Sequence, residues 1–213
     1  MTISATTQGL RPGVCTSTSR PSSPFDGQVI YETDTNRVLV WDNSAWVMIA
    51  DTDTPPGLQL VKTQTIGTAV SSVTVSDVFS SEFDNYKVVF GATDASLDDQ
   101  AGLLTFGSTS TGYYGSLVYD KYDGSASTIR RNNSSSIYAG ITDSTNATNF
   151  QFDVFSPNLA QRTTVSGMGF GYSLSFWFGG MVANSTQYTA FTWAPSSGTV
   201  TGGTIRVYGY RNS

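Results

Sequence analysis

Short runs of β-forming residues, with apolar side chains at every second position, recur from Leu58 to the end of this 213-residue chain. Val73 and Val75 show the spacing in one run, and Tyr86 and Val88 show it in the next. Because successive side chains of a strand point to opposite faces, this period of two puts the apolar residues on one face of a sheet. No segment has a convincing helical period. The repeat therefore predicts an all-β fold.

About eleven segments match this pattern, at the spacing of a sandwich or a barrel. They span residues 58–66, 73–78, 87–92, 103–106, 117–122, 137–141, 150–155, 163–170, 174–182, 188–193 and 204–210. Strands without intervening helices favour antiparallel pairing. We therefore expect residues 58–213 to form an antiparallel, jelly-roll-like β-sandwich.

Residues 1–24 differ from the rest in carrying Pro12, Pro21 and Pro24 among Ser, Thr and Gly, with few apolar side chains. Such a segment gains too little from apolar contacts to fold alone. Two interpretations remain open. The segment is either a flexible tail or an extended arm that becomes ordered against another subunit.

Residues 25–57 predict a small three-stranded β-meander followed by a linker. The expected strands are 28–33, 38–41 and 45–49, with turns at 34–36 and 42–44, and Pro55-Pro56 marks the linker. Three short strands are only marginally stable by themselves. Tyr31, Trp41 and Trp46 are a large apolar content for such a unit, so they should pack on something else. The alternatives are the main domain of the same chain and, slightly favoured, a partner subunit.

Charge and composition exclude several classes of protein. The net charge is −5 and Arg130-Arg131 is the one dibasic pair, interpreted as a solvated turn, so a nucleic-acid partner is not expected. No apolar run is long enough to insert into a membrane. The N-terminus has neither the basic nor the apolar region of a signal peptide, so we expect synthesis in a cytoplasm without secretion. Cys15 is the single cysteine, which excludes a disulfide within the chain.

Catalytic and metal-binding patterns are weak. The chain has no histidine, which removes the usual general base and the commonest zinc ligand. Asp94, Asp98 and Asp99 fall in one expected loop, which is either a solvated loop or, less favoured, a calcium site. Gly167, Gly169 and Gly171 alternate in an expected strand, where they should make room for large side chains or for a close backbone neighbour. We expect no enzyme activity and no cofactor.

Two groups of aromatic residues are candidate binding residues. In the closing strand, Arg206, Tyr208 and Tyr210 fall on the face opposite Ile205 and Val207. They could contact a neighbouring subunit or form a second face within one chain. The second group could stack on sugar rings, because an aromatic face suits apolar C–H patches; for Trp177, packing within the core is the favoured alternative. That second group is Tyr113, Tyr114 and Trp177.

The segment from residue 11 to residue 47 resembles a module of tailed-phage virion proteins. The resemblance lies in RPGVCTS (11–17), RPSSPFDGQVIYETDT (20–35) and WDNSAWV (41–47). In those proteins the module precedes a β-sandwich similar to residues 58–213, with a Val-Phe…Phe-Asp-Asn-Tyr segment near its start and a final strand like IRVYGY (205–210).

This resemblance implies a minor structural protein of the virion, commonly a homotrimer, that binds other tail or capsid proteins through residues 1–50. The implied anchoring residues are Arg11, Pro12, Cys15, Arg20, Pro21, Pro24, Tyr31, Trp41 and Trp46. The first hypothesis is a tail or head fibre that exposes the sandwich to a host surface glycan or receptor. The alternatives are a capsid-decoration (cement) protein and, less favoured, a carbohydrate-active enzyme.

Overall fold

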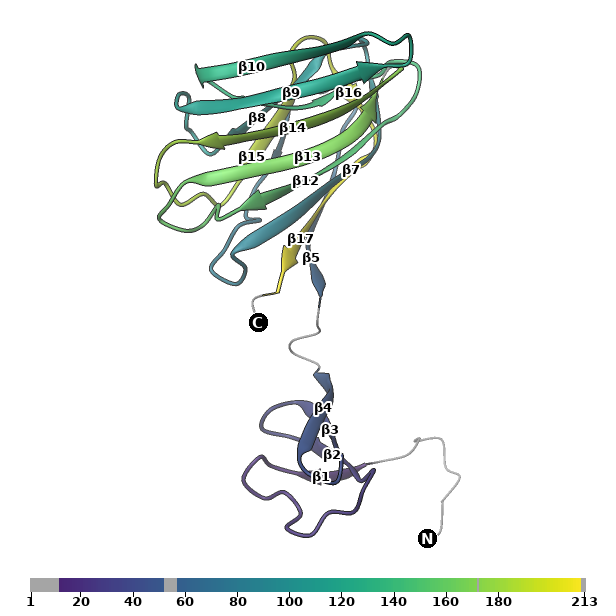
Figure 1. Cartoon of the computed structure of the whole chain (residues 1–213), viewed down its shortest axis with the longest axis vertical. Coiled ribbons are helices and arrows are strands. Elements are labelled where there is room, and N and C mark those ends of the chain that lie inside the picture. The colour runs from purple at the N-terminus through teal and green to yellow at the C-terminus, as the bar shows by residue number, and fades with distance from the viewer. Residues whose placement is uncertain (1–11, 52–56, 172, 212–213) are drawn as a thin grey trace. The chain divides into compact units, whose positions relative to one another are not determined.

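The structure, a computed structural model, describes residues 12–51, 57–171 and 173–211 (Figure 1). Contacts between Cα atoms divide the chain into two compact units, Met1–Pro56 and Gly57–Ser213. Every regular element in the described residues is a strand, which confirms the all-β prediction. These residues include no helix with the length and apolar character to cross a membrane.

The first unit contains one small mixed sheet. Its strands, in spatial order, are β1 (Gly13–Cys15), β2 (Val29–Glu32), β3 (Arg37–Trp41) and β4 (Trp46–Asp51). Strands β2, β3 and β4 pair antiparallel, as expected for the meander. The two connecting turns contain Asn36 and Asn43 with positive φ angles of 53° and 73°. Asparagine tolerates this left-handed conformation better than most residues, so the turn residues favour the two hairpins.

The prediction of three strands is wrong by one, because β1 pairs with β2 in parallel. This strand has three residues and begins with Gly13, so it carries no alternation that a sequence pattern could reveal. Its pairing also joins positions that are far apart in sequence, with Val14 opposite Tyr31. A segment interpreted as either a flexible tail or an extended arm thus supplies an edge strand of the small sheet.

The second unit contains two antiparallel sheets. The strands are β5 (Leu58–Thr65), β6 (Val73–Val75), β7 (Asn85–Ala95), β8 (Ala101–Phe106), β9 (Tyr113–Lys121), β10 (Ala126–Ser134), β11 (Ile137–Ile141), β12 (Thr148–Phe155), β13 (Thr163–Gly171), β14 (Leu174–Val182), β15 (Phe191–Pro195), β16 (Val200–Thr201) and β17 (Thr204–Tyr210). The large sheet has the order β10-β9-β14-β13-β12-β7-β17-β5, and β16 pairs with β7. The small sheet has the order β11-β8-β15-β6.

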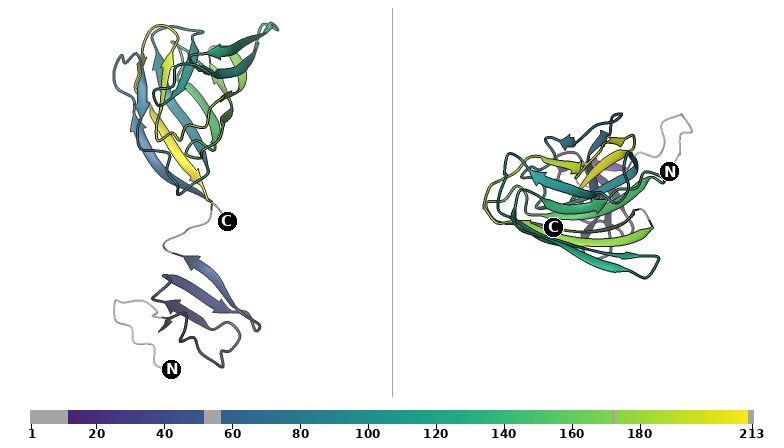
Figure 2. Two further views of the ribbon diagram at one scale, coloured as in Figure 1. Left: turned by 90° about the vertical axis from the view of Figure 1, so that its left-hand side faces the viewer. Right: turned by 90° about the horizontal axis from the view of Figure 1, so that it is seen from above.

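The two sheets form two layers (Figure 2). Buried side chains from both sheets form a single core, rich in aromatic rings. Phe90 of β7 stacks on Phe150 of β12 with ring centroids 4.3 Å apart. Trp193 of β15 lies against both rings and donates a 2.7 Å hydrogen bond from Nε1 to the carbonyl of Ala139. The indole therefore contributes apolar area without leaving its N–H unsatisfied.

The alternating glycines of β13 make room for aromatic rings of β14, as predicted. A Cβ atom on Gly167 would lie 2.5 Å from Cζ of Phe178, and one on Gly169 would lie 2.7 Å from Cζ of Phe176. Both distances are below any real contact between carbon atoms. The glycines therefore allow the aromatic rings of the neighbouring strands to cross over β13.

Two strands of this unit were not expected, β10 and β16. Strand β10 includes Arg130-Arg131, so the interpretation of this pair as a solvated turn is wrong. Charged and polar residues suit β10 because it is an edge strand, where they discourage pairing with another chain. Arg131 also lies over the ring of Tyr138, 3.9 Å from the ring centroid. Strand β16 has two residues, too few to show a period.

Candidate functional site

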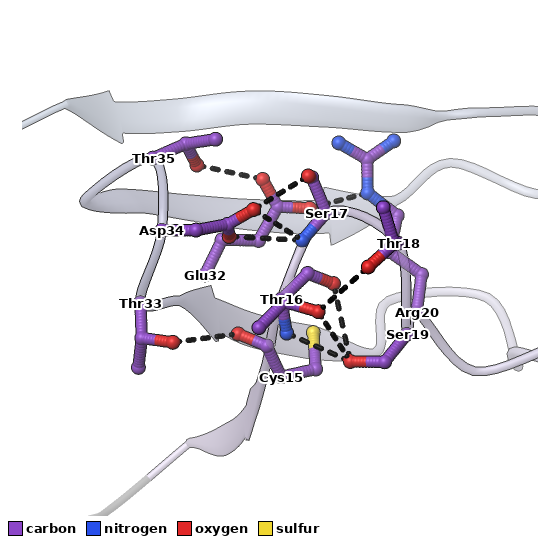
Figure 3. Close-up of polar contacts among 10 residues, drawn as sticks. All are labelled: Cys15, Thr16, Ser17, Thr18, Ser19, Arg20, Glu32, Thr33, Asp34 and Thr35. Carbon is purple, nitrogen blue, oxygen red and sulfur yellow. Dashed lines mark hydrogen bonds and ion pairs between the residues drawn. The ribbon is translucent and has the colours of Figure 1, made fainter.

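In the first unit, the segment that follows β1 is held against the sheet by side-chain hydrogen bonds (Figure 3). The backbone N–H of Ser17 donates to Oδ1 of Asp34 at 2.9 Å, and the Ser17 hydroxyl donates to Oδ2 at 2.6 Å. These bonds hold the pKa of the Asp34 carboxyl below its usual value, with the Ser17 hydroxyl as the largest cause. The carbonyl of Cys15 also accepts the N–H of Thr33 at 3.0 Å.

A buried carboxylate ties the same segment to β2. The side chain of Glu32 has no exposed surface, and its Oε1 forms an ion pair with Nε of Arg20 (Figure 3). Its Oε2 accepts a 2.7 Å hydrogen bond from the Thr35 hydroxyl. The pKa of Glu32 is therefore lowered, chiefly by the hydrogen bond from Arg20. Among the residues that the structure describes, the buried apolar residues of this unit are Ile30 and Leu39, so Glu32 is a large part of what the small sheet buries.

One face of the small sheet carries six apolar or aromatic side chains, which we call the valine face. It consists of Val14, Val29, Tyr31, Val38, Val40 and Val47. The strand registers put Val29, Val40 and Val47 in one row and Val14, Tyr31 and Val38 in the next. The exposed fractions of Val14, Val29 and Val47 are 46%, 39% and 42%. A contiguous apolar face of this kind is a candidate interaction surface.

In the second unit, a hollow lies on the outer face of the large sheet. Strand pairing places Trp177 of β14 between Val118 of β9 and Met168 of β13. The next outward position on β14 is Gly179, which pairs with Ser116 and Ser166 on the two neighbouring strands. The small residues leave a depression of about 320 Å³ beside the indole. The side chain of Trp177 is 49% exposed, so it forms a wall of the hollow rather than part of the core.

Polar groups line the opposite side of this hollow, in β7 and β12. They are Lys87, Gln151 and Asp153. Lys87 Nζ lies 3.5 Å from Oδ1 of Asp153, and the hydroxyl of Tyr210 donates to the same oxygen at 2.6 Å. Among the described residues, Oδ2 of Asp153 has no hydrogen-bond partner. The site therefore combines an exposed aromatic face with free hydrogen-bonding capacity.

The predicted sugar-stacking residues have different environments. Tyr113 is fully buried, and its hydroxyl accepts the N–H of Phe106 at 2.8 Å, so the expectation that its ring could meet a sugar is wrong. Tyr113 and Leu117 lie four positions apart in β9, so the two-residue period of the strand points both side chains to the buried face. Tyr114 is half-buried, and Trp177 alone of the three is largely exposed.

In the closing strand, Ile205 and Val207 are buried and Arg206 is exposed, which confirms the predicted alternation. Tyr208 and Tyr210 are half-buried, and Tyr210 bonds within its own sheet to Asp153. Leu60 of β5 pairs with Tyr208 and therefore lies beside the face of β17 that carries Arg206, Tyr208 and Tyr210.

The expected anchoring residues are gathered in the first unit, except Arg11, which lies outside the described residues. Trp41 and Trp46 pack edge to face, with ring centroids 5.5 Å apart. The prolines and Cys15 are half-buried, and Arg20 is exposed. Sequence reasoning missed Glu32, Asp34 and Ser17, whose partners are 12 to 17 positions away. It also missed the polar residues of the hollow, which no local motif marks.

The three aspartates of the expected loop do not gather around a common point. Lys121 Nζ forms an ion pair with Oδ2 of Asp99 at 3.1 Å, and Asp98 accepts the N–H of Ser144 at 2.5 Å. Across the described residues, no group of three or more metal-ligating side chains is present.

Comparison with known proteins adds no assignment: no family model, no curated protein and no solved structure matches this chain.

Proposed function

We propose that this protein is a non-enzymatic structural component of a tailed-phage virion. It acts as a short tail or head fibre, attached to the particle through residues 1–50, and presents a jelly-roll-like sandwich to the host surface. The observation that carries the proposal is the valine face of the small sheet. This face bears no charged residue, and three of its valines are more than a third exposed. Burying it against another virion protein removes this apolar surface from water.

The folded contacts of residues 12–35 support the same role. The hydrogen bonds of Ser17 to Asp34 and the ion pair of Arg20 with Glu32 order this segment before any partner binds. A preorganised surface loses less conformational entropy on binding than a flexible arm does. The first unit therefore suits attachment, and the separate second unit suits presentation.

The proposal includes a homotrimer. Leu58 and Leu60 of edge strand β5 are 46% and 57% exposed, and they lie opposite Tyr210 and Tyr208 of β17. This apolar end of the sheet is the candidate contact between copies. Sedimentation equilibrium of the purified full chain should give three times the mass of one chain.

Immunogold imaging of intact virions with an antibody to the full chain tests the main proposal. Label at the tail or at discrete head sites supports a fibre, and label spread evenly over the head supports capsid decoration instead. Virions without label refute both assignments.

A pair of variants tests the role of the valine face. Val47→Glu places a charge on this face and should abolish incorporation into particles. Met48→Glu is the matched control, because Met48 is the next residue of β4, is 48% exposed and points to the opposite face. Equal incorporation of the two variants would show that the valine face is not the attachment surface.

A further inference from the structure

We infer that the hollow beside Trp177 binds one pyranose ring of a neutral saccharide. The inference rests on the proposed attachment function and names the class of ligand that the exposed sandwich would recognise.

The shape of the hollow suits a single sugar ring. Its volume of about 320 Å³ lies at the lower end of the range for small-ligand sites, which is about 300–1,000 Å³. Gly179 forms part of its lining, and a Cβ atom there would meet nothing closer than the carbonyl oxygen of Val165 at 3.7 Å. The missing side chain thus leaves open space directly beside the indole of Trp177.

The chemistry of the lining also suits a sugar. A pyranose has apolar C–H patches, which pack on an aromatic face, and a rim of hydroxyls, which need hydrogen-bond partners. The indole of Trp177 supplies the aromatic face. The hydrogen-bond partners are Gln151, Ser166 and the free Oδ2 of Asp153, because amide, hydroxyl and carboxylate groups can bond to sugar hydroxyls.

The charges of the lining favour a neutral ligand. Lys87 and Asp153 are the charged residues among those that line the hollow, and they pair with each other at 3.5 Å. Their charges offset, so neither an anionic nor a cationic ligand gains a large Coulombic attraction. A purely apolar ligand fits poorly, since it would leave Lys87 and Asp153 desolvated without new partners.

The test is NMR titration of the full-length, ¹⁵N-labelled protein with methyl glycosides of glucose, galactose, mannose, rhamnose and N-acetylglucosamine. The chain has four tryptophans, and the indole N–H signal of Trp177 is assigned by its loss in Trp177→Phe. At least one glycoside should shift this signal in a saturable manner. Absence of a shift with every glycoside at millimolar concentrations overturns the inference.

Three variants examine the geometry. Gly179→Val fills the hollow from a strand position that has space, and Trp177→Ala removes the stacking face; each should weaken binding at least about tenfold. Tyr122→Ala is the control, because Tyr122 is 73% exposed but does not line the hollow, and it should leave affinity unchanged. Unchanged affinity in Gly179→Val would place the sugar elsewhere and refute the assigned site.

The outcome is separable from that of the proposed function. Labelled virions with no glycoside binding would overturn this inference and leave the structural role standing. Glycoside binding at Trp177 by a protein absent from virions would support the site and refute the virion assignment.

Discussion

The phenol of Tyr210 donates a 2.6 Å hydrogen bond to Oδ1 of Asp153, and it thereby joins β17 to β12 across the intervening strand β7. Burial and this hydrogen bond raise the pKa of Tyr210 to about 12. The phenol therefore stays protonated, and able to donate, throughout the physiological pH range. The last strand of the chain in this way positions a carboxylate of the hollow.

Tyr210→Phe should lower the free energy of unfolding of the second unit by about 1 kcal/mol, the usual net contribution of one hydrogen bond. Urea denaturation measures the change. Tyr208→Phe is the matched control, because the hydroxyl of Tyr208 has no hydrogen bond with the described residues. Equal losses in the two variants would mean that the bond to Asp153 does not stabilise the sheet.

Arg20→Ala should destabilise the first unit by about 1–3 kcal/mol, because it leaves the buried Glu32 carboxylate without its cationic partner. Near-ultraviolet circular dichroism of the Trp41–Trp46 pair reports on this unit. Lys121→Ala, which breaks the more exposed pair with Asp99, should change stability by less than about 1 kcal/mol. A dichroism melting curve for Arg20→Ala identical to that of the unmodified chain would contradict the prediction.

Acid should unfold the first unit through the same pair. The pKa of Glu32 in the folded unit lies below the value of 4.5 for an unperturbed glutamate. Its contribution to stability is therefore fully present above about pH 4.5 and is lost as the pH falls toward the folded value. The Trp41–Trp46 dichroism of Glu32→Gln should depend less on pH over this acidic window. An equal dependence in both proteins would show that another carboxyl controls the transition.

Gly167→Ala should lower the free energy of unfolding of the second unit by about 1–3 kcal/mol, since the added methyl group would lie 2.5 Å from Phe178 and 2.6 Å from the carbonyl oxygen of Gln151. Gly179→Ala on the adjacent strand should be neutral or stabilising by up to about 1 kcal/mol, because the nearest atom to the added methyl group, the carbonyl oxygen of Val165 at 3.7 Å, is at ordinary contact distance. Urea midpoints compare the two. Similar midpoints would mean that the rings over β13 repack freely.

Alkaline pH should destabilise the sandwich through Tyr113. Burial raises its pKa from 10.0 to about 12. Because the unfolded chain releases this proton first, the contribution is fully present below pH 10 and is lost as the pH rises to about 12. Tyr113→Phe removes this part of the pH dependence, although it also leaves the N–H of Phe106 without a partner and lowers stability at neutral pH. Thermal unfolding of Tyr113→Phe and of the unmodified chain between pH 9 and 12, a range set by the usual pKa of tyrosine of about 10, measures the difference. Melting temperatures that fall equally with pH in the two proteins would refute the prediction.

The local pattern of the sequence was sufficient for features that repeat at short range. The alternation in β17 correctly placed Ile205 and Val207 inward and Arg206 outward. The alternating glycines correctly indicated room for large side chains at Gly167 and Gly169. Both follow from the two-residue period of a strand, which each segment carries by itself.

The tertiary structure alone decided which distant residues meet. The pairing of β1 with β2, the ion pair of Arg20 with Glu32, and the hollow between Trp177 and Asp153 all join separate segments. The burial of Tyr113 likewise depends on its neighbours in the folded sandwich. A strand's sequence determines which side chains share a face, but strand order and register determine what that face lies against, and they arise from packing across the whole sheet.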